Sequence, residues 1–183
     1  MRVRETGIQG VRLVETAPVR DARGAFARLF CENELSEIIK GRHIVQINQS
    51  WTRIPGTVRG LHYQRPPYAE MKLIRCLKGR AWDVAVDLRK GSRTLLQYFT
   101  HVLEPDSLIM VAIPEGFAHG FQVLESDTEL LYLHTTPFVP DSAGIIRFDD
   151  PKVDIAWPLP VVEVSDRDKG APLLDAVFEG FEI

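Results

Sequence analysis

One stretch of the sequence carries both the fold signal and the chemistry: Arg59-Gly60-Leu61-His62-Tyr63-Gln64-Arg65-Pro66-Pro67, followed by Glu70-Met71-Lys72. It places a potential base, two arginines, a phenol, an amide and an ammonium group among apolar residues typical of strands. Because alternate side chains of a strand share a face, we expect Arg59 beside Leu61 and His62 on the opposite face. A second strand starting at Lys72 would aim His62 and Lys72 into one cavity. The alternative is a lone histidine on an ordinary sheet.

The chain on both sides of this stretch shows the same strand-like pattern, interrupted by turn residues. Residues 45–50 alternate, so that Gln46, Asn48 and Ser50 share one face. Further strands are predicted at 10–16, 25–30, 72–77, 82–88, 95–103, 108–113, 117–124 and 129–135. A spacing of about 8–12 residues between short strands predicts an all-β sandwich, jelly roll or barrel.

Two segments depart from the strand pattern. Asn33 can cap a short N-terminal helix over residues 34–40, which Gly41 would end. Residues 149–183 are rich in proline and extended, yet too apolar to be disordered, so we expect this tail to pack on the barrel or on a partner. The length of 183 residues predicts a single domain, 1–183, that includes this tail.

Composition narrows the functional class. The net charge is −3 and the pI is about 6.0, so there is no basic footprint for nucleic acid. No apolar run approaches the roughly 20 residues of a membrane span, and the N-terminus has no apolar signal core. Cys31 and Cys76 are too few for a disulfide scaffold. We therefore expect a cytoplasmic protein with reduced thiols and with neither nucleic acid nor membrane as a partner.

The histidines do not form the motif that small β-barrels use to bind metals. His62 is followed by Tyr63 and Gln64, so the second histidine of a His-x-His pair is missing. A ligand set of His62, Glu70 and His119 remains an alternative. We expect no metal and no other cofactor.

The remaining reactive residues suit acid–base chemistry. A neutral histidine such as His62 is a good base near pH 7. Lys72 can stabilise a developing oxyanion, and the phenol of Tyr132 can return a proton. This set suits proton abstraction next to a carbonyl, while Arg23, Arg28 and Arg59 can hold phosphates. The alternatives are that Tyr132, which is flanked by leucines, belongs to the core and that Arg28 is a solvated surface residue.

Nine motifs in order resemble the dTDP-4-dehydrorhamnose 3,5-epimerase family of nucleotide-sugar epimerases, and together they cover nearly the whole chain. Singly these motifs are weak, but nine of them in order at family-like spacing are specific. They are Asp21-Ala22-Arg23-Gly24, Gln46-Ile47-Asn48-Gln49-Ser50, Arg59-Gly60-Leu61-His62-Tyr63-Gln64, Lys72, Asp83-Val84-Ala85-Val86-Asp87-Leu88-Arg89, Ile113-Pro114-Glu115-Gly116-Phe117-Ala118-His119-Gly120-Phe121, Tyr132, Asp150-Pro151 with Trp157-Pro158, and Ser165-Asp166-Arg167-Asp168.

The resemblance implies a metal-free, cupin-type jelly-roll barrel, usually a homodimer with exchanged N-terminal strands. It implies an isomerase that removes a proton next to the ketone of a nucleoside-diphospho-4-keto-6-deoxy sugar and reprotonates the enolate on the opposite face. His62 would be the base, supported by Asp168. Tyr132 would be the acid, and Lys72 would stabilise the enolate. The implied substrate-binding residues are Arg23, Phe26, Arg28, Gln46, Asn48, Arg59, His119 and Phe138.

The chain departs from the family pattern at two positions. Members of the rhamnose pathway commonly carry Glu where this chain has Arg28, and Tyr where it has Phe138. Recognition of the nucleotide or the sugar would differ accordingly. Two alternatives therefore stay open: a mono-epimerase of the same family acting on another nucleotide sugar, and a non-catalytic sugar-nucleotide-binding cupin. A binding module needs no matched acid and base, so His62, Lys72 and Tyr132 together favour an enzyme.

Overall fold

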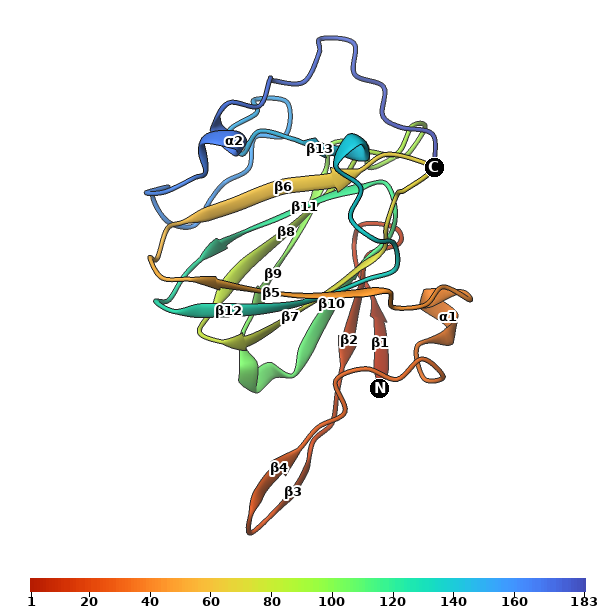
Figure 1. The fold of residues 1–183 in the computed structure, drawn as a ribbon, viewed down its shortest axis with the longest axis vertical. Coiled ribbons are helices and arrows are strands. Elements are labelled where there is room, and N and C mark those ends of the chain that lie inside the picture. Colours follow the sequence, from red (N-terminus) through yellow and green to blue (C-terminus); the bar gives the residue numbers. More distant parts are fainter.

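The computed structural model describes residues 1–183 and consists of two facing antiparallel sheets, the layout of a jelly roll (Figure 1). The predicted all-β fold is confirmed. The strands of the six-stranded sheet are, in spatial order, β1 (Arg2–Glu5), β2 (Arg12–Glu15), β10 (Ile109–Ile113), β7 (Lys72–Lys78), β12 (Thr128–His134) and β5 (Gln46–Thr52). Those of the five-stranded sheet are β13 (Ala143–Ile145), β6 (Val58–Gln64), β11 (Phe117–Val123), β8 (Ala81–Asp87) and β9 (Tyr98–Leu103).

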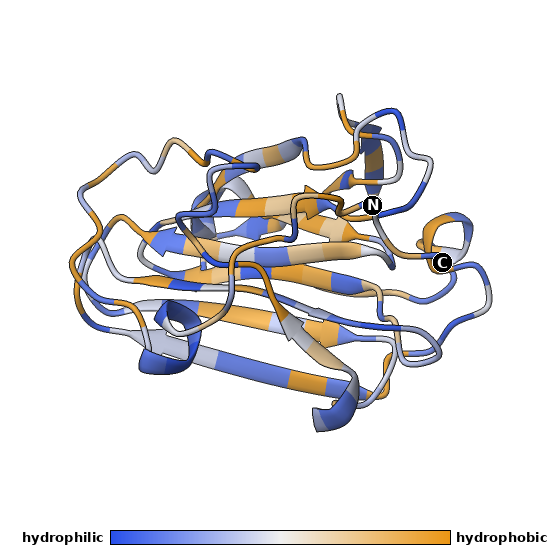
Figure 2. Ribbon diagram, turned by 90° about the horizontal axis from the view of Figure 1, so that it is seen from above, coloured by the Kyte–Doolittle hydropathy of each residue, from blue (hydrophilic) through white to orange (hydrophobic).

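The core between the sheets fills one end of the barrel. Ile74 and Cys76 on β7 and Leu130 on β12 are buried in one apolar cluster with residues of β8, β10 and β11. At the opposite end of the barrel, β7 and β12 carry polar side chains. There His134 of β12 is paired with Lys72 of β7. Figure 2 shows hydrophobic and hydrophilic residues alternating along the strands. The same strands thus provide an apolar core at one end and a polar cavity wall at the other.

The N-terminal segment differs from the prediction in two respects. Strand β1 was not predicted, and the strand expected at 25–30 ends at Phe26. Instead, β3 (Val19–Asp21) and β4 (Gly24–Phe26) form a hairpin around the predicted turn, where the Arg23 N–H donates to Asp21 Oδ1. The hairpin extends away from the barrel (Figure 1), and its strands pair only with each other.

The predicted N-terminal helix is reduced to one turn, α1 (Ser36–Ile39), and the predicted cap is wrong. Residues 31–35 form consecutive turns, in which the Leu35 N–H donates to the Cys31 carbonyl. Leu35, not Asn33, is the N-cap residue and makes no side-chain cap. These turns place Leu35 and Ile39 against the outer face of the six-stranded sheet. Two further single turns, η1 (Pro105–Ser107) and η2 (Pro140–Ser142), lie in loops. None of the helices has the length and the apolar composition that crossing a membrane requires.

The strand expected at 95–103 starts only at Tyr98. The residues before it form a loop that wraps around Asp87, whose Oδ2 accepts hydrogen bonds from Ser92 Oγ at 2.6 Å and Thr94 Oγ1 at 2.7 Å. Leu96 has φ +64°, which strand geometry excludes. The hydrogen bonds to the Asp87 carboxylate therefore hold these residues in a loop, although their alternating sequence pattern predicted a strand.

The C-terminal tail packs on the barrel. Trp157, Leu174 and Phe178 pack against the outer face of the five-stranded sheet. The buried carboxylate of Asp150 accepts hydrogen bonds from the backbone N–H groups of Lys152 and Leu174, at 2.9 Å and 2.7 Å. Between these anchors lies α2 (Asp166–Lys169), next to β6 (Figure 1). The tail thus returns to the barrel and places α2 beside the central stretch.

Candidate active site

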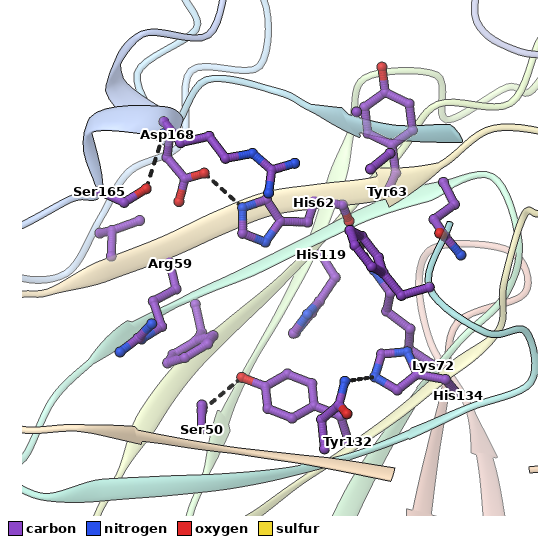
Figure 3. A pocket seen from close by; sticks show the side chains of 18 of the residues that line it. Ser50, Arg59, His62, Tyr63, Lys72, His119, Tyr132, His134, Ser165 and Asp168 are labelled. Atoms are coloured by element: carbon purple, nitrogen blue, oxygen red, sulfur yellow. Dashed lines mark hydrogen bonds and ion pairs between the residues drawn. The ribbon is translucent and has the colours of Figure 1, made fainter. Parts of the chain in front are cut away.

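A cavity of about 530 Å³ lies between the two sheets, lined by their polar side chains (Figure 3). Strands β5, β7 and β12 supply one wall, β6 and β11 supply the other, and α2 lies at its edge. Most of the residues predicted for the site line this cavity: His62, Lys72, Tyr132, Asp168, Gln46, Asn48, Arg59, His119 and Phe138.

His62 is backed by a buried carboxylate. Its Nε2 lies 2.8 Å from Asp168 Oδ1, and the Gly60 N–H donates to Asp168 Oδ2 at 3.3 Å. Burial raises the pKa of Asp168, but the bonds from His62, Gly60 and Ser165 outweigh it and hold that pKa below its usual value. The side chain of Asp168 is 5% exposed and that of His62 is 46%. An ionised Asp168 accepts a hydrogen bond from the Nε2–H group of His62, which leaves the Nδ1 lone pair of His62 able to act as a base.

Strand β6 is irregular at this point, and the expected separation of Arg59 from His62 is wrong. Both line the cavity, because the pairing register with β11 shifts between His62 and Arg59. Gly60 has φ +109°, and a Cβ on it would lie 2.7 Å from the Cα of Gly120. The glycine therefore allows close approach of two backbones where the strand bulges. The bulge adds Arg59 to the cavity wall that holds His62.

Lys72 lies beside His62 on the facing sheet. Its Nζ donates to the His62 carbonyl at 3.0 Å and lies 3.2 Å from Glu70 Oε1. The side chains of Lys72 and Glu70 are both buried. The prediction that two strands would aim His62 and Lys72 into one cavity is confirmed.

Tyr132 projects from β12 toward the cavity, across from His62 (Figure 3). Its hydroxyl lies 3.0 Å from Ser50 Oγ. Burial raises the pKa of Tyr132 well above its ordinary value, and the Ser50 bond only partly offsets this. The phenol is therefore protonated at neutral pH and can donate. The His62 ring and the Tyr132 hydroxyl thus stand on opposite walls of the cavity.

His119 forms a second histidine–carboxylate pair in the cavity wall. Its Nε2 lies 2.7 Å from Asp83 Oδ1, and both side chains are buried. Its ring packs edge-on against Tyr132 at 6.1 Å between centroids. The alternative ligand set of His62, Glu70 and His119 is not assembled, because each of these groups pairs with a different partner. No group of three His, Cys, Asp or Glu side chains is placed to hold a metal ion.

Two residues of the site were missed as a pair by the sequence analysis. His134 Nδ1 lies 2.7 Å from Glu70 Oε2, and its Nε2 lies 3.3 Å from Asn48 Nδ2. The signal was present, because His134 follows Tyr132 by two residues and must share its face of β12. At the cavity mouth, the N–H of Phe138 donates to Gln46 Oε1 at 3.0 Å. Arg167, also not predicted, lines the cavity from α2.

Three predicted binding residues lie outside the cavity of their own chain. Arg23 and Phe26 lie on the β3–β4 hairpin, where their side chains are largely exposed, and Arg23 pairs with Asp21 at 2.6 Å. Arg28 pairs with Glu34. The hairpin points away from the barrel, so within one chain these residues cannot reach the cavity (Figure 1).

The known proteins that this chain resembles are epimerases of deoxysugar nucleotides. A family model described as dTDP-4-dehydrorhamnose 3,5-epimerase matches residues 5–176. A protein of that name from Salmonella typhimurium is 40% identical over 178 residues, covering 96% of each chain. A 3,5-epimerase from Legionella pneumophila, solved with dTDP-4-keto-L-rhamnose, superposes with a TM-score of 0.90 at 35% identity, covering 96% of this chain and 94% of that one. A 3′-monoepimerase from Streptomyces bikiniensis, solved with dTDP-quinovose, gives a TM-score of 0.83 at 28% identity, covering 92% and 85%.

Proposed function

This chain belongs to the dTDP-4-dehydrorhamnose 3,5-epimerase family of isomerases, and from that premise we propose that it epimerises a nucleoside-diphospho-4-keto-6-deoxy sugar. The observation that carries this proposal is the His62–Asp168 pair facing Tyr132 across one cavity, with Lys72 beside the base. A ketone acidifies the hydrogens on its neighbouring carbons. A base, an oxyanion donor and an acid on the far wall are the groups that inversion of such a carbon requires.

The reaction follows from these positions. His62 Nδ1 takes the proton from the carbon next to the ketone, and the electron pair moves into the enolate. Asp168 stabilises the imidazolium that forms. Lys72 donates a hydrogen bond to the enolate oxygen. Tyr132 then delivers a proton to the opposite face of the same carbon, so that the configuration is inverted. Exchange with water returns Tyr132 and His62 to their starting protonation states.

The nucleoside diphosphate would lie at the open part of the cavity. Arg59 and Arg167 line it, and guanidinium groups bind phosphates through paired hydrogen bonds. Two similar structures were solved with such ligands, the Legionella enzyme with dTDP-4-keto-L-rhamnose and a Bacillus anthracis epimerase with TDP and PPi. Both cysteines are free thiols, which fits the cytoplasmic location we propose.

We also propose a homodimer in which the β3–β4 hairpin of one protomer completes the cavity of the other. The hairpin supports this proposal because a two-stranded hairpin with exposed Val19 and Phe26 has no core of its own. Arg23, whose side chain is 90% exposed, would then reach the phosphates. Mixing an inactive His62→Asn protein with an Arg23→Ala protein tests this, since one site of each mixed dimer would contain both native residues. At a substrate concentration well below the KM of Arg23→Ala, the mixture should be more active than the Arg23→Ala protein alone, and no gain would contradict the exchange.

A mono-epimerase remains the second candidate. Inverting a second carbon requires the sugar to reorient so that its other acidic hydrogen faces His62. Phe138 lies at the cavity mouth without the hydroxyl of a tyrosine, and a similar structure is a 3′-monoepimerase. A tyrosine hydroxyl at this position could hold the reoriented sugar by a hydrogen bond. Its absence favours slower inversion of one carbon, although a water molecule can replace the hydroxyl.

The test is proton exchange in heavy water. A dTDP-4-keto-6-deoxy sugar incubated with the enzyme should gain two deuterium atoms at unequal rates, as followed by mass spectrometry. Gain of a single deuterium would establish the mono-epimerase. No gain with any nucleotide would overturn the enzymatic proposal and leave a non-catalytic binding protein.

A further inference from the structure

The cavity contains a carboxylate that the reaction above does not use. We propose that Glu70 is a positioning residue with two roles, each through one oxygen: it orients the Lys72 ammonium toward the enolate, and it fixes the tautomer of His134, so that Asn48 presents its carbonyl oxygen to a hydrogen-bond donor of the substrate. The first role rests on the proposed function. The tautomer of His134, on which the second role depends, is a property of the free protein.

Glu70 divides its two oxygens between two buried partners. Oε1 lies 3.2 Å from Lys72 Nζ, and Oε2 lies 2.7 Å from His134 Nδ1. None of the three side chains is more than 10% exposed. Burial raises the pKa of Glu70, but the His134 bond and the Lys72 charge outweigh it, so the pKa lies below its usual value. Glu70 is therefore an ionised acceptor for both neighbours.

Charge balance selects the tautomer of His134. Glu70 and Lys72 already form a neutral buried pair, and a protonated His134 would add a buried charge without a counter-ion, which is costly. A neutral His134 that donates Nδ1–H to Glu70 has its lone pair on Nε2. That lone pair accepts from Asn48 Nδ2 at 3.3 Å. The carbonyl oxygen of the Asn48 amide then remains available in the cavity that Asn48 lines.

The hydrogen-bond count of Lys72 supports the first role of Glu70. An ammonium group has three N–H donors. The His62 carbonyl takes one at 3.0 Å and Glu70 Oε1 takes another at 3.2 Å. Two fixed acceptors determine the direction of the third N–H, which is left for the enolate oxygen. Without Glu70 the His62 carbonyl is the one fixed acceptor left, so the Lys72 side chain can shift around that single hydrogen bond and its third N–H loses its fixed direction.

The tautomer is tested first, by nitrogen-15 NMR of histidine-labelled protein without substrate. His134 is expected in the Nδ1–H form. In Glu70→Gln, the single amide oxygen must accept from Lys72, so the amide NH₂ faces His134 and the histidine switches to Nε2–H. A doubly protonated or Nε2–H His134 in the native protein would overturn the proposal, and so would a native-like tautomer in Glu70→Gln.

Kinetics test the link to Lys72. Glu70→Gln should lower kcat for deuterium exchange by about a hundredfold while KM changes little. Lys72→Met removes the donor itself, so adding Glu70→Gln to Lys72→Met should cost little more. A double variant slowed by the full product of the two single effects would overturn the coupling. Glu115→Gln is the matched control, because it removes a partly buried carboxylate that is paired with Arg42 and lies outside the cavity.

A second variant covers the case in which Glu70→Gln does not fold. Glu70→Asp keeps the charge but shortens the reach, and it should retain Nδ1–H on His134 while slowing exchange. Unchanged exchange in Glu70→Asp would overturn the role toward Lys72. Absence of exchange in the native enzyme would instead contradict the proposed function, and the NMR result on His134 would still stand or fall by itself.

Discussion

The cavity wall and the β3–β4 hairpin both carry predicted site residues, but only the wall brings them together. Most wall residues lie on strands that are paired within the two large sheets, and this pairing fixes them: His62 lies opposite His119, and Lys72 opposite His134. The hairpin strands pair only with each other, and Phe26 is 74% exposed. An alternating sequence pattern therefore predicts where a side chain points only when neighbouring strands fix the strand that carries it. We propose that the hairpin has its neighbours in a second copy of the chain.

The largest expected effect lies on the wall. His62→Asn should slow deuterium exchange by about 10²–10⁴-fold, because the other two carboxylate-paired histidines of the cavity, His119 and His134, are buried, whereas the His62 side chain is 46% exposed. Substrate affinity, measured by calorimetry, should change little. His43→Asn is the control, since His43 is exposed and pairs with Glu32 outside the cavity. Near-native turnover in His62→Asn would mean that another residue is the base. The cavity wall would then not be the region that supplies the essential base.

A smaller effect of a different kind is expected from the hairpin. Arg23→Ala should weaken binding of dTDP by about ten- to a hundredfold, the equivalent of one charge-assisted hydrogen bond, and leave kcat nearly unchanged. Calorimetric titration with dTDP measures this, with Arg93→Ala on a surface loop as the control. Unchanged affinity would show that the hairpin does not contribute to binding in either protomer.

The next prediction concerns stability and sharpens the role of the tail within the wall. The pKa of Asp168 is lowered in the folded protein, so its ionised form stabilises the fold at pH values above its unfolded pKa, near 3.9. This contribution is lost as pH falls through the lower, folded pKa. Asp168→Asn should therefore cost on the order of 1 kcal/mol at pH 7, and the difference should shrink below about pH 4. Thermal unfolding of both proteins across this range is the measurement, and a difference that grows with acid would contradict it.

The smallest expected effect is none. Exhaustive chelation should leave exchange activity unchanged, because Lys72 supplies the oxyanion stabilisation that a metal would otherwise provide. Activity lost on chelation and restored by a divalent cation would mean that the wall is incomplete without an ion.

The sequence predicted the side chains of the regular strands well. Period-two alternation predicted that Gln46, Asn48 and Ser50 share one face of their strand, and all three line the cavity. The same rule applied to β12 would have added His134. It failed where a local interaction overrides the period. The bulge at Gly60 places Arg59 on the same cavity wall as His62, and this depends on the close approach of β11, which the sequence of β6 alone does not reveal. The position of Asp168 opposite His62 came only from the family resemblance, because more than a hundred residues separate them.

The family resemblance was also the basis for predicting that hairpin residues bind the substrate, because no pattern within the chain indicates that role. Asn33 had the right chemistry for a cap but not the right backbone, since the turns around it were set by burial of Leu35. Local propensity thus lost to tertiary packing at this helix.

The docking of the tail has a consequence for heat resistance. Asp168 lies outside the two sheets, in a tail that is attached to the barrel at separate points: Gln122 bonds both backbone groups of Leu159 at 2.9 Å, Glu163 forms an isolated bridge with Thr57, and Asp150 bonds Leu174 at 2.7 Å. Segments of this kind open at lower free energy than the whole domain. Warming would therefore detach the carboxylate from His62 while the barrel remains folded. The temperature at which the enzyme stops working is then set by the tail, and it lies below the temperature at which the sheets melt.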